Sequence, residues 1–193
     1  MANNFSIINI LDLIDNVGEN EVVESISCFN CDKNNEIEEF LHQDAIDFAK
    51  RKISVTHLIF DNEANIVGYF TLTHKPIRVP SDLLTNTTKK KIERFTKLDE
   101  ATNIYDVSAF LIAQFGKNSS CNLSISGDEM MNMALSILSK VQREVGGGIV
   151  FLECEDNEKL LDFYQNENNR FIIYGNRYSN KENITYKQLL RLF

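Results

Sequence analysis

The chain has 193 residues, 43% of them hydrophobic and 25% charged, which fits one ordinary globular domain over residues 1–193 and argues against a disordered protein. Its formal net charge of −8 argues against general attraction to nucleic acid or anionic membranes. No apolar run approaches the ~20 residues that span a bilayer, and segment 1–15 lacks the basic start of a secretory signal, so we expect a cytoplasmic protein with reduced cysteines.

The N-terminal third of the chain predicts a helix next to a β-hairpin. Phe5–Leu13 is apolar and fits either a strand or a short helix, and Glu21–Phe29 alternates weakly, as a strand does. Apolar residues at helical spacing predict an amphipathic helix over Asn35–Arg51. The segments Val55–Asp61 and Ile66–Lys75 predict the two strands of the hairpin, joined by a polar turn at residues 62–65.

Two prolines follow the hairpin. Pro76 and Pro80 are expected to end it, and Ser81 is expected to cap a polar helix. This helix region carries a cluster of cations: Lys89, Lys90, Lys91, Arg94 and Lys97. Such a cluster is usually a solvated helix face, and the alternative is contact with the phosphates of a nucleic acid or a nucleotide.

The C-terminal half alternates between strands and helices. The predicted strands are Val107–Phe115, Ile149–Cys154, Phe171–Tyr174 and Ile184–Leu192, and the predicted helices are Asp128–Val145 and Asn157–Gln165. The whole pattern indicates an α+β fold with one mixed sheet of six to seven strands flanked by helices. The strand–helix–strand unit from Val107 to Cys154 is expected to be parallel.

The polar loop over residues 116–126 lies between a buried strand and a helix that starts near Gly127. Loop amides and the free N–H groups of a helix N-terminus favour anions, and a glycine lets a ligand approach the backbone closely. A diphosphate would suit such a site. Many α/β proteins have the same turn with nothing bound, so the pattern alone leaves both interpretations open.

Several spaced residues carry a resemblance to a known family. Tyr105 and Ala109 fit a Tyr-x-x-x-Ala motif, and Gln114 follows the apolar run of the same strand. Two further matches lie downstream, Gly127 with Met130, Met131 and Ala134 against Gly-x-x-Leu-Leu-x-x-Ala, and Asn157 with Phe163 and Tyr164 against Asn-x-x-Ala-x-x-Phe-Tyr. On these residues the chain resembles the GNAT N-acetyltransferases, and among them the subgroup of aminoacyl-tRNA-acetylating toxins.

The resemblance implies a GNAT acyltransferase fold and direct transfer of an acetyl group from acetyl-CoA to an amine, with no metal. It implies that Tyr164 is the general acid that protonates the leaving thiolate. The residues implied to bind acetyl-CoA are Gln114, Phe115, Gly116, Lys117, Asn122, Ile125, Ser126, Gly127, Asp128 and Asn157. The loop departs from the family pattern, because Asn122 stands at the Arg or Gln position and Ile125 replaces the first glycine.

Each of these residues also has a plainer interpretation. Tyr164 could be an aromatic residue at the edge of the core, Asn157 a helix N-cap, and Gln114 a partner of hydrogen bonds within the sheet. The Cys28-x-x-Cys31 pair lacks the second ligand pair of a structural zinc site, so we expect two ordinary thiols.

Two classes of function remain open at this stage. The first is an acetyltransferase acting on a primary amine, where the subgroup resemblance favours the amino group of aminoacyl-tRNA and the net charge of −8 favours a small amine or a protein. The second is a catalytically weak or inactive GNAT-fold module that binds acyl-CoA or a protein. An antitoxin partner and a homodimer are further states that the resemblance leaves open.

Overall fold

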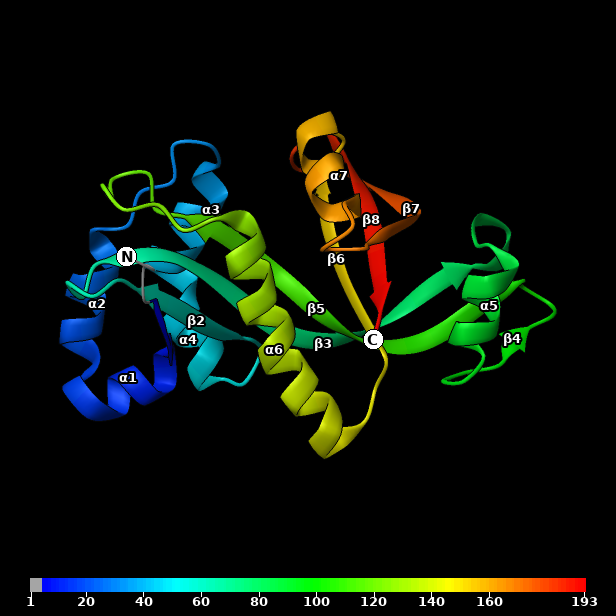
Figure 1. Ribbon diagram of the computed structural model, residues 1–193, viewed down its shortest axis with the longest axis horizontal. Coiled ribbons are helices and arrows are strands. Elements are labelled where there is room, and N and C mark those ends of the chain that lie inside the picture. Colours follow the sequence, from blue (N-terminus) through cyan, green and yellow to red (C-terminus); the bar gives the residue numbers. More distant parts are fainter. Residues whose placement is uncertain (1–4) are drawn as a thin grey trace. The chain divides into compact units, whose positions relative to one another are not determined.

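The computed structural model describes residues 5–193, so the first four residues of the N-terminal segment 1–15 lie outside the described part. Its strands form one mixed sheet in the order β1-β2-β3-β5-β6-β8-β7, with β4 paired to β5 (Figure 1). The chain divides into two compact units. One comprises residues up to Thr73 together with Ile112–Ala134, and the other comprises His74–Leu111 together with Leu135–Phe193.

The first unit begins with strand β1 (Ser6–Asn9) and helix α1 (Ile10–Val17), so Phe5–Leu13 contains both of the elements between which its sequence was ambiguous. The Asn9 side chain accepts a hydrogen bond from the Leu11 amide at 2.9 Å and starts the helix. Gly18, with φ of 93°, ends it, because this backbone conformation costs a residue with a Cβ more than it costs glycine.

Helix α2 (Glu19–Ser27) occupies the segment for which a strand was predicted over Glu21–Phe29, so that prediction is wrong. Val22 and Ile26 are fully buried, whereas Val23 is half exposed. Two buried residues four positions apart share one face of a helix, and a strand would place alternate residues inside. Burial of this helical face therefore outweighs the β-propensity of the two valines.

The helix predicted over Asn35–Arg51 is present in three joined pieces. These are α3 (Asn35–Glu39), a π-helical turn η1 (Phe40–Asp44) and α4 (Ala45–Lys50). Together with α1 and α2 they lie beside β1 and β2 (Figure 1). They enclose the core of this unit, whose buried members are Ile10, Val22, Ile26, Phe29, Cys31, Leu41, Ala45, Ala49, Leu58, Phe60, Ile66 and Tyr69.

The predicted hairpin is confirmed. Strand β2 (Val55–Phe60) pairs antiparallel with β3 (Ile66–Pro80), and Asp61 organises the turn by accepting hydrogen bonds from the amides of Glu63 and Asn65, both at 2.9 Å. Strand β3 is longer than predicted, because it passes through Pro76 and ends at Pro80. In the second unit Ile77 and Val79 are buried, so the alternation of a strand continues where the prolines suggested an end.

The segment after β3 belongs to the second unit and contains a 3₁₀ turn η2 (Ser81–Leu83), helix α5 (Asn86–Ile92) and strand β4 (Leu98–Asp99), which was not predicted. Ser81 does not cap the helix. Thr85 does so instead, since its hydroxyl accepts a hydrogen bond from the Thr88 amide at 3.2 Å. Ser81 starts the 3₁₀ turn, and its amide bonds the Asn103 carbonyl at 3.0 Å.

The remaining elements agree with the predicted order. They are β5 (Ile104–Lys117), α6 (Gly127–Val145), β6 (Ile149–Glu155), α7 (Glu158–Gln165), β7 (Ile172–Ser179) and β8 (Ile184–Leu192). Phe110 and Leu111 of β5 pair in parallel with β6, as the strand–helix–strand unit predicts. With β1 and β4 the sheet has eight strands, one more than the upper end of the prediction.

Candidate functional site

Strand β5 ends in four of the predicted ligand-binding residues, all in the first unit. Gln114 and Phe115 are half-buried, Gly116 is buried and Lys117 is exposed. A Cβ at Gly116 would lie only 2.4 Å from Cγ2 of Ile37, and the rings of Phe29 and Tyr69 lie close by. Gly116 is therefore required by the packing of β5 against α3, and its role toward a ligand stays a prediction.

The loop after β5 is held by Asn118. Its amide bonds the Val67 carbonyl at 3.0 Å, and its side-chain Nδ2 donates to the Ile66 carbonyl at 2.8 Å. Its Oδ1 accepts hydrogen bonds from the amides of Asn30 at 3.2 Å and Ser120 at 2.9 Å. One side chain therefore ties the loop to the start of β3 and to the segment between α2 and α3.

Ser119 adds two bonds to the same segment. Its amide donates to the Asn30 carbonyl at 2.7 Å, and its hydroxyl accepts from the Asp32 amide at 3.1 Å. The amides of residues 118–120 thus bond protein groups. These three amides are therefore not free for an anion, and the proposed anion segment narrows to residues 121–127, of which the Ser126 amide is also bonded within the protein.

The start of α6 contains a capping box. The Ser126 hydroxyl accepts a hydrogen bond from the Glu129 amide at 3.1 Å, and the Glu129 carboxylate accepts one from the Ser126 amide at 3.0 Å. These bonds hold the pKa of Glu129 below its ordinary value. Ile125, just before the box, is fully buried, whereas Asn122 is exposed.

The capping box decides how well this end of α6 fits a diphosphate. Gly127 opens the helix without a side chain, as a phosphate site requires. The Glu129 carboxylate, however, already lies at the positive end of the helix dipole, and Asp128 adds a second acidic residue in the first turn. Lys117 interacts electrostatically with both carboxylates, although burial is the main cause that lowers its pKa. The amides of Ser126 and Glu129 are thus already bonded within the box, and the local charge opposes an anion.

Tyr164 and Asn157 belong to the second unit, on and before α7. Asn157 is the N-cap of this helix, since its Oδ1 accepts a hydrogen bond from the Lys159 amide at 3.0 Å. Tyr164 is buried, and its ring makes edge contacts with Phe163 and Phe171 at centroid distances of 4.9 and 6.0 Å. Burial raises the pKa of Tyr164 well above its ordinary value, so its hydroxyl keeps its proton at neutral pH.

The loop that follows α7 fixes the position of Tyr164. The Phe171 amide bonds the Tyr164 carbonyl at 2.9 Å, and Asn169 Nδ2 donates to the Phe163 carbonyl at 2.7 Å. Arg191 on β8 donates to the Asn169 carbonyl at 2.8 Å. Residues 165–167 and 170–172 line a hollow of about 430 Å³ beside this loop. Two elements therefore hold the backbone on either side of the tyrosine.

Other polar side chains have structural partners. Glu153 accepts hydrogen bonds from Arg177 Nε at 2.6 Å and from Gln188 Nε2 at 2.8 Å. Tyr105 is fully buried, and its hydroxyl donates to Glu93 at 3.0 Å. Cys28 is exposed, Cys31 is buried, and both are free thiols. Across residues 5–193 no three His, Cys, Asp or Glu side chains gather as metal ligands would.

Two residues at this site, Glu129 and Asn118, were missed by the sequence prediction. The Ser-x-x-Glu spacing of Ser126 and Glu129, directly before an apolar helical pattern, is a capping-box signature, so the role of Glu129 could have been predicted from the sequence. Asn118 gave no such signal, because its partners lie in segments remote from it in the sequence.

None of the helices in the described residues is long and apolar enough to cross a membrane.

No protein-family model matches the sequence, and no curated protein matches it either. Solved structures are similar to it over nearly the whole chain. The structure of AtaT complexed with acetyl-methionyl-tRNAfMet matches with a TM-score of 0.66 at 17% identity, covering 95% of this chain and 94% of AtaT. A structure of AtaTR bound with AcCoA matches with a TM-score of 0.60 at 18% identity, covering 100% and 94%.

A tyrosine-to-phenylalanine mutant of KacT matches with a TM-score of 0.67 at 17% identity, covering 97% of this chain and 94% of KacT. Likeness of this extent at such low identity identifies the architecture. The chain therefore has the GNAT acyltransferase fold, the fold of the toxins AtaT and KacT.

Proposed function

We propose that the chain is an acetyl-CoA-dependent N-acetyltransferase that acts on a primary amine, with the amino group of aminoacyl-tRNA as the first acceptor to test. One observation carries the proposal. The fold covers nearly the whole length of AtaT, which is known in complex with acetyl-methionyl-tRNAfMet and, together with its antitoxin AtaR, with acetyl-CoA. The same likeness makes a small antitoxin a proposed partner.

The proposed chemistry is attack of the amine on the thioester carbon of acetyl-CoA. Backbone N–H groups near Phe115–Lys117 would stabilise the charge that develops on the thioester oxygen. The Tyr164 hydroxyl, which keeps its proton at neutral pH, would donate it to the departing thiolate as the C–S bond breaks, and the acylated nitrogen would lose its extra proton to water. Burial makes this hydroxyl a weaker acid than a free tyrosine, so the role rests on the resemblance. Asn122, Ile125, Ser126, Gly127 and Asp128 remain the proposed diphosphate segment.

Substitution of Tyr164 by phenylalanine tests the proposed acid. The change removes one hydroxyl and keeps the ring contacts with Phe163 and Phe171. Release of free CoA in the presence of an amine should fall by about 100-fold or more. Tyr174→Phe is the matched control, because Tyr174 is also a buried tyrosine of this unit. Undiminished CoA release by Tyr164→Phe would show that another group protonates the thiolate.

Binding of acetyl-CoA is tested separately by titration calorimetry. A Trp side chain at Gly127 would fill the start of α6, so Gly127→Trp should abolish the binding that the wild-type protein shows. Detection of acetylated aminoacyl-tRNA after incubation with acetyl-CoA would then identify the acceptor, and a panel of small amines tests the alternative acceptors.

A second candidate function is a GNAT-fold module that binds acyl-CoA or a protein without turnover. The departures of the loop at Asn122 and Ile125 favour it, and the Ser126–Glu129 capping box favours its protein-binding form in particular, because the Glu129 charge opposes the diphosphate of acyl-CoA. Binding of acetyl-CoA with no CoA release for any amine would support this alternative over the enzyme.

A further inference from the structure

The segment 74–106 of the second unit differs in charge from the rest of the chain. It carries seven Lys and Arg residues against five Asp and Glu residues, a formal charge of +2 in a chain of −8. The remainder of the chain therefore carries −10. Long-range attraction of a polyanion to the whole protein is excluded by this balance, and only a local surface of this segment can hold one.

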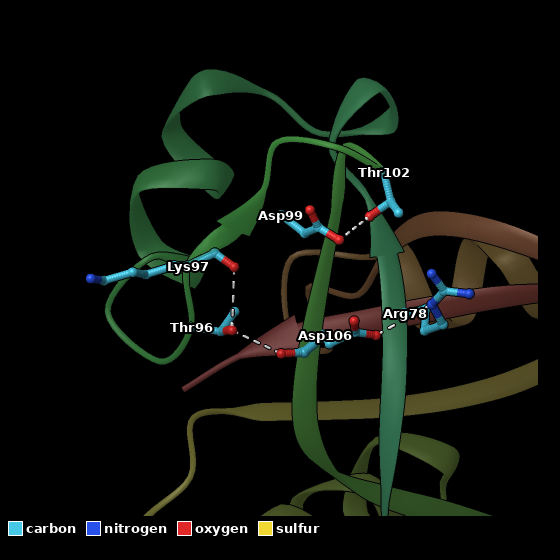
Figure 2. Close-up of polar contacts among 6 residues, drawn as sticks. All are labelled: Arg78, Thr96, Lys97, Asp99, Thr102 and Asp106. Carbon is cyan, nitrogen blue, oxygen red and sulfur yellow. Dashed lines mark hydrogen bonds and ion pairs between the residues drawn. The ribbon is translucent and has the colours of Figure 1, made fainter.

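Carboxylates of this segment are bound to neighbours other than the lysines. Figure 2 shows Asp106 paired with Arg78 at 3.3 Å and Asp99 accepting a hydrogen bond from Thr102 at 2.8 Å. Asp82 accepts from Asn103 Nδ2 at 2.7 Å, and Glu93 accepts from the Tyr105 hydroxyl at 3.0 Å. Four of the five acidic side chains are thus fixed by these partners.

The cations of α5 and the turn after it form no ion pair with any of residues 5–193. They are Lys89, Lys90, Lys91, Arg94 and Lys97. Lys97 illustrates the separation, because its side chain points away from Asp99 and Asp106 (Figure 2). Five positive charges therefore remain on one stretch of nine residues without internal neutralisation.

This charged stretch has a fixed backbone. Ile92 and Leu84 anchor α5 in the core of the second unit, and Thr85 caps the helix. Thr96, next to Lys97, donates a hydrogen bond to the Asp106 carbonyl of β5 at 2.8 Å (Figure 2). The ring of Phe95 lies against the backbone of Gly148, where an added Cβ would come within 1.8 Å of it, and is still half exposed. The stretch that carries the cations thus also holds a half-exposed aromatic residue, of the kind on which unpaired bases stack.

We propose that Lys89, Lys90, Lys91, Arg94 and Lys97 bind the phosphate backbone of an RNA acceptor. This inference rests on the proposed function and adds the surface that holds the nucleic-acid part of the substrate. Lysine and arginine contacts to phosphates release counterions, so this binding is independent of sequence and weakens steeply with salt. The acidic remainder of the chain limits the affinity, and RNA contact is confined to this surface.

A triple variant, Lys89→Ala, Lys90→Ala and Lys91→Ala, tests the surface. Alanine favours helix more than lysine does, so α5 is kept. Unacylated transfer RNA is titrated by fluorescence anisotropy at several salt concentrations. The variant should bind at least tenfold more weakly at low salt, and the slope of log affinity against log salt should fall by about 0.9 for each lost phosphate contact on duplex RNA, by analogy with duplex DNA.

The matched control removes three exposed cations elsewhere in the same unit, by Lys140→Ala, Arg143→Ala and Lys181→Ala. It should bind transfer RNA as the wild type does. The inference is overturned if both variants lose affinity for transfer RNA equally, or if the wild type binds no transfer RNA. Binding to phosphatidylserine vesicles is measured in parallel, and a triple variant that loses only vesicle binding would also overturn the inference.

The same proteins are assayed for acetyl-CoA binding and for CoA release with a small amine. Both should be unchanged in the lysine variant. If the wild type binds transfer RNA through this surface but binds no acetyl-CoA, the proposed function fails and the RNA surface stands. If the wild type binds acetyl-CoA and turns it over, but the triple substitution leaves the binding of transfer RNA unchanged, the proposed function stands and the RNA surface fails.

Discussion

Glu129 places a negative charge at the start of α6, where its carboxylate bonds the Ser126 amide at 3.0 Å. A carboxylate at this position stabilises the helix through its interaction with the helix dipole. The same charge repels any phosphate that approaches the helix. A stabilising cap and ligand affinity are therefore in conflict at this residue.

Glu129→Gln separates the two effects. The amide oxygen can still accept the hydrogen bond from Ser126, while the charge is lost. We expect the affinity for acetyl-CoA to rise about two- to fivefold and the free energy of unfolding to fall slightly. Titration calorimetry and urea unfolding measure the two quantities. Glu144→Gln, an exposed change in the last turn of α6, is the control and should leave the affinity unchanged.

His57 makes stability depend on pH. It is buried on β2, its ring stacks on Phe70 at 5.4 Å, and its Nδ1 bonds no other group in residues 5–193. Burial lowers the pKa of His57, while the Val55 backbone and Asp12 oppose the shift. A histidine of the unfolded chain gains its proton below about pH 6.5, whereas buried His57 resists protonation. As far as His57 contributes, the free energy of unfolding is therefore highest above that pH and decreases as the pH falls below it.

The His57→Phe variant should therefore lose part of this decline. We expect the free energy of unfolding to fall less steeply between about pH 6.5 and 5 than in the wild type, where this group contributes at most about 1.4 kcal/mol per pH unit. Urea unfolding at a series of pH values measures the slope. His74→Gln, at an exposed histidine, should leave the slope unchanged, and an identical slope in His57→Phe would show that other groups cause it.

At the scale of elements, the contact between β5 and α3 depends on Gly116. A Cβ there would lie 2.4 Å from Ile37 Cγ2, a distance that forces one element to move. Gly116→Ala should lower the free energy of unfolding by about 1–3 kcal/mol. On an Ile37→Ala background the same change should cost at least about 1 kcal/mol less, because the opposing methyl is gone. Additive losses in the denaturant curves would place the strain elsewhere.

Sequence patterns predicted the elements whose signals agree at every level. The amphipathic helices α6 and α7 and the β2–β3 hairpin combine periodicity with clear turn or cap residues. The error over Glu21–Phe29 arose because its weak alternation resembles that of a strand, whereas the burial of Val22 and Ile26 on one face decides for helix α2. Strand β3 was cut short at Pro76 because burial of Ile77 and Val79 is decided by distant residues.

The candidate site was predicted less well than the fold. Motif spacing located the β5–α6 segment and α7, but it carries no information about which amides the protein itself uses. The bonds from Asn118 to Asn30 and Ile66 join segments far apart in the sequence, so only the folded chain reveals them. The roles of the predicted ligand-binding residues therefore remain proposals that binding experiments must decide.

For the whole molecule, the distribution of charge matters more than its total. The first unit carries fifteen Asp and Glu residues against five Lys and Arg residues, whereas the second unit carries a formal +2. Repulsion among like charges destabilises a compact state. The first unit is therefore the part of the protein that screening by salt should stabilise.

We expect the melting temperature to rise with added sodium chloride, by about 2–4 °C for each kcal/mol of repulsion that is screened. Differential scanning calorimetry at low and high salt measures the rise. A variant with Asp15→Asn, Glu24→Gln and Glu36→Gln, three exposed acidic residues of the first unit, should show a smaller rise. A melting temperature that falls with salt would mean that attractive ion pairs outweigh the repulsion.

The four thiols differ enough in exposure to give the protein a natural labelling handle. Cys28 is exposed, whereas Cys31 and Cys154 are buried, and burial raises the pKa of Cys154 to about 11 and also raises that of Cys121. A maleimide dye at neutral pH should thus attach to Cys28 first, without any engineered cysteine. Because Cys28 is two residues from Asn30, which bonds the loop through Asn118 and Ser119, the dye would report by fluorescence whether a ligand loosens that loop.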